Sequence, residues 1–172
     1  MNEDLYYFLK GYVYDNHKEG FKVNKDKNTL TIYGNTSVVL WIFGILLLAW
    51  SVVSFIYTPF IVALALLAIA VFGFFMPLTK RTVFDLGKKE IRQDTFFITG
   101  TTIKPDKIAN YHTTIVKVNG MIKSYVFDFE YYAMGEYNAE KKFMMKGVAG
   151  FKTMKDLMDF QPVVTRVLNE MK

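Results

Sequence analysis

The chain has 172 residues, of which 52% are hydrophobic and 17% aromatic, and its net charge is +5. It has no cysteine, which excludes disulfides and thiolate metal sites, and only two histidines, too few to favour a transition-metal centre. This length fits one soluble domain with a membrane anchor better than two domains.

The N-terminal segment is predicted to be a short amphipathic helix over residues 2–17. Asn2 is a candidate N-cap, and the apolar residues fall on one side. This side fits packing on the protein's own domain better than lying in a membrane interface. The reason is that only Lys10 and Lys18 supply positive charge for an interfacial helix.

Two short strands are predicted next, at 21–25 and 29–33, joined by a turn at 26–28. Their place in the fold has two interpretations. They can belong to the same domain as the later strands, in which case the apolar segment between them is an insertion. Alternatively, they form a separate β-ribbon at the membrane surface.

The central feature of the sequence is an uncharged window from residue 28 to residue 79. It contains two apolar runs, 38–57 and 60–78, broken only at Thr58-Pro59. Each run is close to the ~20 residues that cross a ~30 Å hydrocarbon layer as a helix. We therefore expect a transmembrane helical hairpin. The second run is rich in alanine, which would let a neighbouring helix approach closely.

The charge distribution predicts how this hairpin is oriented. Five basic and five acidic residues precede the window, whereas sixteen basic and eleven acidic residues follow it, and the turn at Thr58-Pro59 is uncharged. The positive-inside rule then places both termini in the cytoplasm. The sequence thus predicts a multi-pass protein of the cytoplasmic membrane, and the glycosylation sequon at 35–37 would be inert on that side.

After the apolar window the pattern becomes that of a β-rich domain ending in an amphipathic helix. Thr153 begins this helix with a pattern that resembles a capping box, and the helix continues to Met171. The predicted strands are 82–86, 90–99, 108–118, 121–132 and 141–148.

Asn119-Gly120 is the strongest hairpin signal in the chain. A two-residue turn there places Val118 opposite Met121 and, counting back, His112 opposite Phe127. The alternation of side chains then predicts that one side of the second strand faces the core. That side carries Tyr125, Phe127, Phe129 and Tyr131.

A set of basic residues on either side of the apolar window is the candidate binding site for membrane lipid. At the membrane surface, each could contribute ~1 kcal/mol of attraction to anionic headgroups. The simpler interpretation is that they only set topology. Nucleic acid is not an expected partner, because acids are interleaved with the basic residues. The candidates are Lys25, Lys27, Lys80, Arg81, Lys88, Lys89 and Arg92.

The sequence predicts no catalytic, cofactor-binding or metal-binding residue. Asp128 and Glu130 share a strand face, but Tyr111 and Lys117 are expected on the same side, which favours a solvated, charge-balanced face over a pair of catalytic carboxylates. His112 is interpreted as a core histidine rather than a catalytic base.

The other histidine, His17, lies in a polar turn and is interpreted as a solvated residue.

The order of elements resembles that of bacterial membrane-anchored proteins with a pleckstrin-homology-like domain. The resemblance rests on TVFDLGKKEI at 82–91, directly after the helical hairpin, and on KPDKI at 104–108. It implies seven antiparallel strands in a small sheet or barrel, capped by a C-terminal helix. In many such proteins the hairpin precedes the whole domain, whereas here it interrupts the strand series. The predicted segments are 1–35, 36–79 and 80–172, within an α+β fold.

Two functions follow as hypotheses. The first is a non-enzymatic membrane protein whose domain binds a partner protein or a second copy of itself, and so assists assembly of a membrane complex. The alternative is recognition of anionic lipid or another anionic ligand at the membrane surface. An enzymatic function is the least favoured hypothesis, because no sequence motif indicates a reaction.

Overall fold

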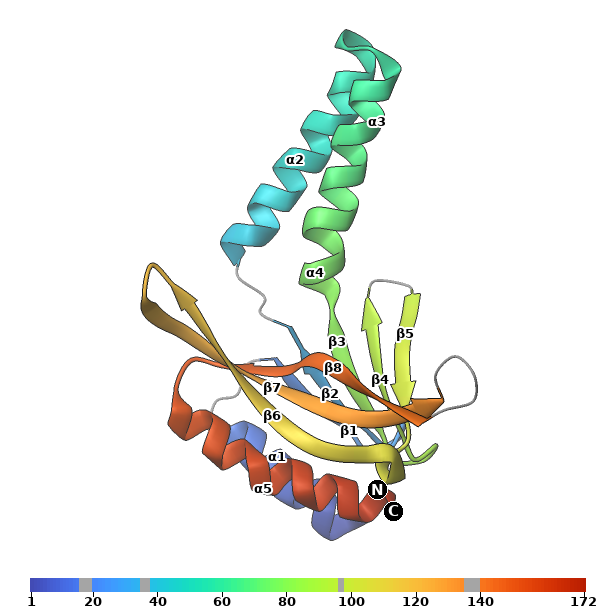
Figure 1. Cartoon of the computed structure of the whole chain (residues 1–172), viewed down its shortest axis with the longest axis vertical. Coiled ribbons are helices and arrows are strands. Elements are labelled where there is room, and N and C mark those ends of the chain that lie inside the picture. The colour runs from blue at the N-terminus through green and yellow to red at the C-terminus, as the bar shows by residue number, and fades with distance from the viewer. Residues whose placement is uncertain (16–19, 35–37, 96–97, 135–139) are drawn as a thin grey trace.

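The computed structural model describes residues 1–15, 20–34, 38–95, 98–134 and 140–172. The sequon at 35–37 and His17 lie outside this described part. The chain is α+β, with two antiparallel sheets, a C-terminal helix and a long helical projection (Figure 1).

The first sheet is a five-stranded antiparallel meander in the order β1-β2-β3-β4-β5. Strand β2 lies before the apolar window and β3 after it, yet they are direct neighbours, with Tyr33 opposite Arg81 and Leu30 opposite Phe84. The first two strands therefore belong to the same sheet as the later ones, and the interpretation as a separate ribbon was wrong. The strands are β1 (Phe21–Asn24), β2 (Thr29–Tyr33), β3 (Arg81–Asp85), β4 (Glu90–Thr95) and β5 (Ile98–Ile103).

Among the described residues there are eight strands rather than the predicted seven. The segment predicted as one strand over 90–99 ends at Thr95, and a separate strand, β5, begins at Ile98 and runs back antiparallel to β4. A register irregularity between Arg92 and Asp94 accompanies this pairing. No turn-forming pair such as Asn-Gly marks the reversal in the sequence, which is why the sequence pattern predicts one continuous strand over 90–99.

The second sheet has the order β6-β7-β8 and follows the short 3₁₀ turn η2 (Pro105–Lys107). Its turn at Asn119 and Gly120 has positive φ at both residues, as predicted for a two-residue hairpin. The strands are β6 (Ile108–Val118), β7 (Met121–Met134) and β8 (Glu140–Phe151).

The predicted register of the β6–β7 hairpin holds only next to its turn. Val118 lies opposite Met121 and Lys117 opposite Ile122, but Val116 lies opposite Ser124, because the ladder shifts between Val116 and Lys117. An extra residue on one strand moves the pairs that follow by one position, until a second shift between Ile108 and Asn110 brings Ile108 opposite Tyr131. His112 therefore lies opposite Asp128 and not opposite Phe127, which corrects the expected pairing.

Two helices and the two sheets enclose an aromatic core. Helix α1 (Glu3–Asp15) is capped by Asn2, whose Oδ1 accepts the Leu5 N–H at 2.7 Å, and α5 (Met154–Met171) is capped by Thr153. Both helices lie below the sheets (Figure 1), and the Arg166 guanidinium of α5 lies over the Phe8 ring of α1, 4.3 Å from its centroid. The expected packing of the N-terminal helix on its own domain is confirmed, since Leu5 is fully buried in the core.

Phe160 of α5 lies at the centre of that core. Its ring contacts Phe21 of the first sheet, and Phe127 and Phe151 of the second, at centroid distances of 5.0–5.6 Å. Phe84 of β3 meets Phe129 of β7 edge to face at 6.1 Å. The aromatic side predicted for β7 thus faces the core, and these rings join the two sheets.

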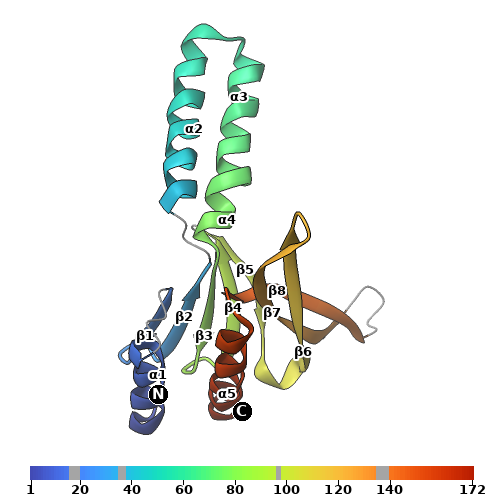
Figure 2. The same ribbon diagram turned by 90° about the vertical axis from the view of Figure 1, so that its left-hand side faces the viewer.

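Residues 38–79 form a projection that we call the helical arm. Its two limbs lie side by side and leave the domain in one direction (Figures 1 and 2). Rings meet near its tip, where Phe55 contacts Phe60 at 5.9 Å, and near its base, where Trp41 contacts Phe75 at 5.8 Å. The limbs are α2 (Val38–Tyr57) and the sequence α3 (Phe60–Ala68), π-helical η1 (Ile69–Phe75) and α4 (Met76–Thr79).

Small residues line the contact between the two limbs. Ser51 and Ala63 are fully buried, and so is Ala70. By length and composition, one helix of the described chain is able to cross a membrane, with its apolar window at Leu40–Tyr57, while the apolar helix Phe60–Gly73 is shorter. Only 17% of the Leu40–Tyr57 window is buried, so α2 is not a core helix of the domain.

Replacing Phe160 with alanine tests the aromatic core. We expect Phe160→Ala to lower the free energy of unfolding by about 3–5 kcal/mol, because it leaves a cavity where three rings meet. The matched control is Met158→Ala on the exposed side of the same helix, expected to change it by about 0.5 kcal/mol or less. Chemical denaturation of the full chain in detergent micelles measures both, and equal effects would contradict this account of the core.

Candidate functional site

The predicted basic residues do not form one cluster. Lys80 and Arg81 lie at the base of the helical arm, where β3 begins. Lys25 and Lys27 lie in the β1–β2 turn, and Lys88 and Lys89 in the β3–β4 turn; both turns are at the opposite end of the first sheet. These two turns are adjacent, because the Leu86 N–H donates to the Asn28 carbonyl at 2.9 Å.

Arg92 is the seventh candidate and lies within β4, opposite Val83.

Most of these basic groups are held by partners within the chain. The Arg81 and Arg92 side chains both lie within 3.5 Å of Asp94, a carboxylate that is only 5% exposed. Lys25 forms an ion pair with Glu3 at 2.9 Å, which lowers the pKa of Glu3, and Lys89 donates to the Lys172 carbonyl at 3.1 Å. These basic groups are engaged in contacts within the chain, so they do not form a set of free cations that faces one ligand.

The residues at the arm base instead build a polar junction between the two sheets. The Lys80 ammonium donates to the Lys146 carbonyl of β8 at 2.7 Å, and the Gln93 amide donates to the same oxygen at 2.9 Å. Asp128 of β7 is 2% exposed and accepts the Gly147 N–H and the Thr114 hydroxyl, each at 2.6 Å. Lys80, directly before β3, therefore meets residues from β4, β6, β7 and β8 where the arm enters the domain.

Asp128 is the member of this junction that sequence reasoning placed wrongly. It was expected on a solvated face with Tyr111 and Lys117, but the register shift puts Tyr111 on the aromatic side. The Tyr111 ring lies 5.6 Å from that of Phe127, and burial raises its pKa. The one available signal was Gly147, a glycine inside a predicted strand, which often marks a close backbone approach.

Gly147 has a positive φ of 69°, a conformation that favours glycine. A β-carbon built at this position would lie 3.2 Å from the Lys80 Nζ atom. A side chain at this position would require the Lys80 ammonium to shift by a few tenths of an ångström, so the positive φ is the stronger reason for glycine here.

Burial lowers the pKa of Lys80, and the nearby Asp128 carboxylate opposes this shift. An ammonium beside a buried carboxylate and satisfied amide groups serves to hold backbone in place. The hydrogen bonds of Lys80 and Gln93 to the Lys146 carbonyl join β8 to the base of the arm.

His112 belongs to a second, more exposed polar group on the same sheet. Its Nε2 lies 3.4 Å from Glu130, which also pairs with Lys142 at 3.5 Å. The expectation of a core histidine on the aromatic side was therefore wrong, because the register shift in the β6–β7 hairpin places His112 opposite Asp128. Within the described ranges, no group of three or more metal-ligating His, Cys, Asp or Glu side chains is present.

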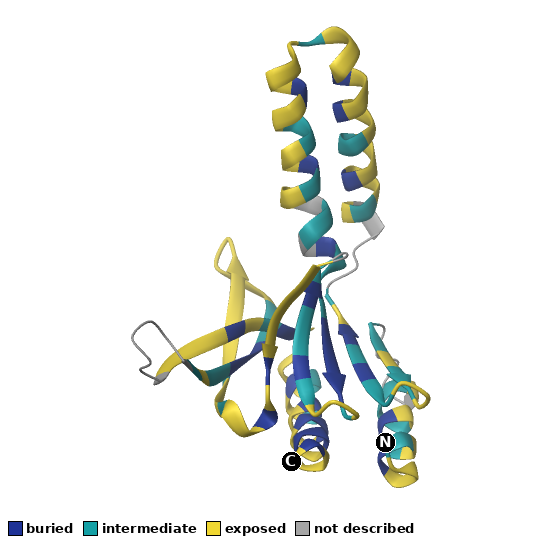
Figure 3. Cartoon of the chain, turned by 90° about the vertical axis from the view of Figure 1, so that its right-hand side faces the viewer, coloured by how far each residue is buried: buried dark blue, intermediate teal, exposed yellow. Residues whose placement is uncertain are grey.

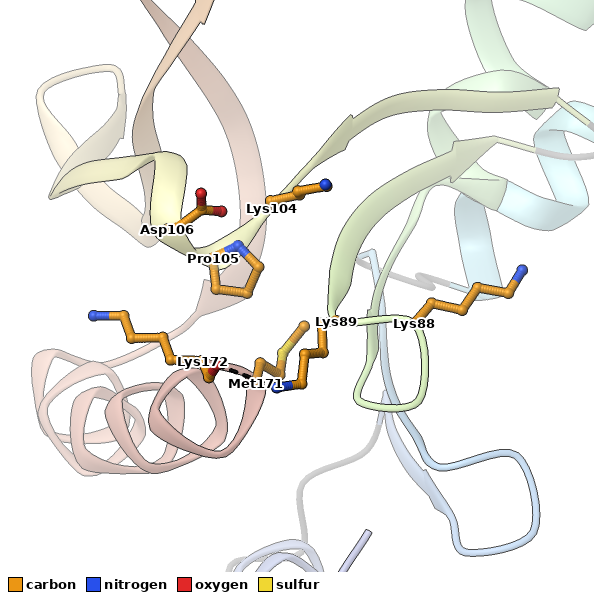
Figure 4. A pocket seen from close by; sticks show the side chains of 7 residues that line it. All are labelled: Lys88, Lys89, Lys104, Pro105, Asp106, Met171 and Lys172. Carbon is orange, nitrogen blue, oxygen red and sulfur yellow. Dashed lines mark hydrogen bonds between the residues drawn. The ribbon is translucent and has the colours of Figure 1, made fainter.

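A hollow of about 360 Å³ lies at the end of the domain away from the arm. Figure 4 shows that the Lys172 side chain points to one side of it and the Lys88 and Lys104 side chains to the other, while Lys89 reaches toward the end of α5. Cations that diverge do not converge on a single anion. This hollow therefore lacks the arrangement of an anion-binding pocket, although four lysines line it.

Comparison with known proteins gave no match among family models, curated proteins or solved structures.

The lowered pKa of Lys80 predicts a specific pH dependence of stability. Below its folded-state pKa, Lys80 is charged in both states and the cost of burying the charge is fully present. As the pH rises through that pKa toward 10.5, the folded state releases its proton first, so the unfolded state binds more protons and stability rises. The unfolding free energy of the wild type should therefore increase relative to Lys80→Met over this range.

Denaturant titrations of the wild type and of Lys80→Met at a series of alkaline pH values measure this difference in unfolding free energy. The other lysines are common to the two proteins, so their titration cancels in the difference. The matched control is Lys152→Met, at an exposed position in the domain. If the unfolding free energy of the wild type minus that of Lys80→Met stays constant or falls as the pH rises, burial of the Lys80 ammonium at the junction is contradicted.

Proposed function

We propose that this protein is a non-enzymatic, multi-pass protein of the cytoplasmic membrane, with both termini in the cytoplasm. The helical arm anchors it, and its β-rich domain binds a partner protein or a second copy, and so assists assembly of a membrane complex. The observation that carries this proposal is the exposure of the arm.

Large apolar side chains cover the outside of the arm. Ile56 of α2 and Ile61 of α3 are 76% and 79% exposed, and Trp50 and Phe72 are 67% and 64% exposed (Figure 3). A helix of this kind needs surroundings other than water, because exposed apolar area of this extent is strongly unfavourable in solution. A bilayer supplies such surroundings to both limbs at once.

The architecture of the domain supports a pleckstrin-homology-like fold as the finer description. Two antiparallel sheets pack across an aromatic core, and a C-terminal helix completes that core. The eighth strand and the N-terminal helix α1 are departures from the seven-stranded pattern. Insertion of the arm between β2 and β3 is a further departure.

Strand β6 supports partner binding by the domain. It is an edge of the second sheet, and all its residues except Ile108 and His112 are exposed. A long exposed edge presents unpaired backbone groups that another chain can use, and proteins usually cover such an edge. Thr113 lies in the exposed middle of β6 and is a suitable position for probing this edge.

The alternative function, recognition of an anionic lipid by the seven candidate basic residues, has less support than partner binding. If the arm spans the bilayer, Lys25, Lys27, Lys88 and Lys89 lie at the end of the domain away from it. Lys80 and Arg81 remain near the surface, but each has an intramolecular partner. The simpler interpretation of the seven residues, that they set topology, requires only their position in the sequence.

Cysteine labelling tests the anchor and its orientation, since the natural chain has no cysteine. We expect Thr58→Cys, at the tip of the arm, to react with a membrane-impermeant maleimide in intact cells. Lys152→Cys, at an exposed position in the domain, should react only after lysis. The reverse pattern, or equal labelling of both, would exclude the proposed topology.

Site-specific photo-crosslinking tests partner binding. A benzoylphenylalanine at Thr113 should yield one discrete crosslinked species in intact membranes, identifiable by mass spectrometry as another protein or a second copy of this chain. The same group at Lys27, exposed on the remote turn of the first sheet, is the matched control. No discrete product from Thr113, or the same products from both positions, would argue against a partner on β6.

A further inference from the structure

The end of the β6–β7 hairpin extends beyond the rest of its sheet. Pairing between β7 and β8 begins at Tyr125 opposite Phe151, so residues 121–124 of β7 pair with β6 alone. We call residues 115–124 the ribbon tip. A two-stranded ribbon without a third strand or a covering helix is marginal in water. Its stability therefore depends on what surrounds it.

The ribbon tip is apolar on both of its faces. Val116, Val118 and Met121 lie on one face, while Ile115 and Ile122 lie on the other, as the pairing in the hairpin requires. All five side chains are 37–62% exposed, and the strand is exposed along this length (Figure 3). Ordinary solvent-facing strands alternate polar and apolar residues, so this double exposure is unusual for a ribbon in water.

The charges around the ribbon tip are of one sign. Lys117 and Lys123 are both exposed, and no aspartate or glutamate occurs between residues 111 and 127. Lysines can lay their aliphatic stems along apolar surface and extend their ammonium groups into a polar layer. Apolar side chains flanked by lysines match the boundary between acyl chains and anionic headgroups.

The ribbon tip also lies on the same side of the domain as the arm. Figures 1 and 2, which view the molecule from perpendicular directions, both show the tip of the β6–β7 hairpin reaching the level at which α2 and α4 leave the domain. A bilayer that holds the arm would therefore have its near surface at the height of the ribbon tip.

From these observations we propose that the ribbon tip inserts into the interface of the membrane that holds the arm, with Lys117 and Lys123 contacting anionic headgroups. This inference rests on the proposed membrane anchoring of the arm. It assigns a lipid-binding element that is separate from the seven basic residues considered above. The ribbon tip then provides a second point of attachment beside the arm.

Fluorescence quenching by lipids tests this inference in the full chain. Met121→Cys is labelled with an environment-sensitive fluorophore and reconstituted into vesicles of phosphatidylcholine and phosphatidylglycerol. We expect a blue-shifted emission and loss of most of the intensity with nitroxides attached near the headgroup. Lys88→Cys, on the remote turn, should show neither change.

A third labelled protein separates this inference from the proposed anchoring. Leu46→Cys, exposed near the middle of α2, should be quenched by nitroxides placed deep in the acyl chains. If Leu46→Cys is quenched and Met121→Cys is not, the anchoring stands and the ribbon tip inference is overturned. If neither is quenched, both fail. A Met121→Cys label that is shielded from aqueous iodide but not quenched by lipid would indicate a protein on the ribbon tip, and would also overturn the inference.

Charge reversal tests the part assigned to the two lysines. Lys117→Glu with Lys123→Glu should reduce the quenching of the Met121→Cys label in anionic vesicles, and added salt should reduce the difference between the proteins. The matched pair Lys27→Glu with Lys88→Glu changes net charge equally at the remote turns and should leave the quenching unchanged. Equal loss with both pairs would overturn the contact between these lysines and headgroups.

Discussion

The hydrogen-bonded pairing of β2 with β3 is the constraint on which the rest of the structure depends. The helical arm leaves the sheet at the end of β2 and returns at the start of β3, and these two strands are neighbours with Tyr33 opposite Arg81. The Gly34 N–H continues the ladder by donating to the Lys80 carbonyl at 2.8 Å. The backbone at Gly34, before the arm, and at Lys80, after it, is thereby held at one strand spacing, ~5 Å.

The second sheet is joined to this constraint at two levels. The aromatic contacts of Phe84 with Phe129, and of Phe160 with rings from both sheets, fix the sheets across the core. At the arm base, Lys80 adds a polar contact by donating to the β8 backbone. The position of the β6–β7 hairpin relative to the arm consequently follows from packed rings and hydrogen bonds.

The sequence was informative wherever a local pattern determines structure. The apolar runs placed the two limbs of the arm, Asn119-Gly120 placed the hairpin turn, and Asn2 and Thr153 marked the helix starts. These features depend on neighbouring residues only, so periodicity and turn chemistry are sufficient to find them.

The remaining features required information that one local pattern does not contain. Pairing of β2 with β3 joins segments separated by the whole arm, and the shift next to Lys117 arises from one extra residue that no turn signal marks. That single shift moved His112 out of the core, and it left Asp128 as a buried acceptor instead of a solvated acid. The candidate site was therefore predicted less well than the fold, because a binding surface depends on register and three-dimensional proximity.

The distribution of basic residues illustrates the same difference between sequence position and place in space. Lys80 and Lys88 are close in the chain, yet they lie at opposite ends of β3, because a strand of five residues separates the two ends of the sheet. Lys117 and Lys123 are far from the apolar window in sequence, yet they flank the turn of the β6–β7 hairpin. The tip of this hairpin reaches the level of the arm base (Figures 1 and 2). Hairpin ends that point along the arm therefore lie on the side of the domain from which the arm leaves. If the arm and the ribbon tip both engage lipid, rotation of the domain about the arm is restricted, and helices α1 and α5 face the cytoplasm. The exposed edge of β6 then lies between the membrane and these helices, in a fixed orientation that favours binding of another membrane-bound chain.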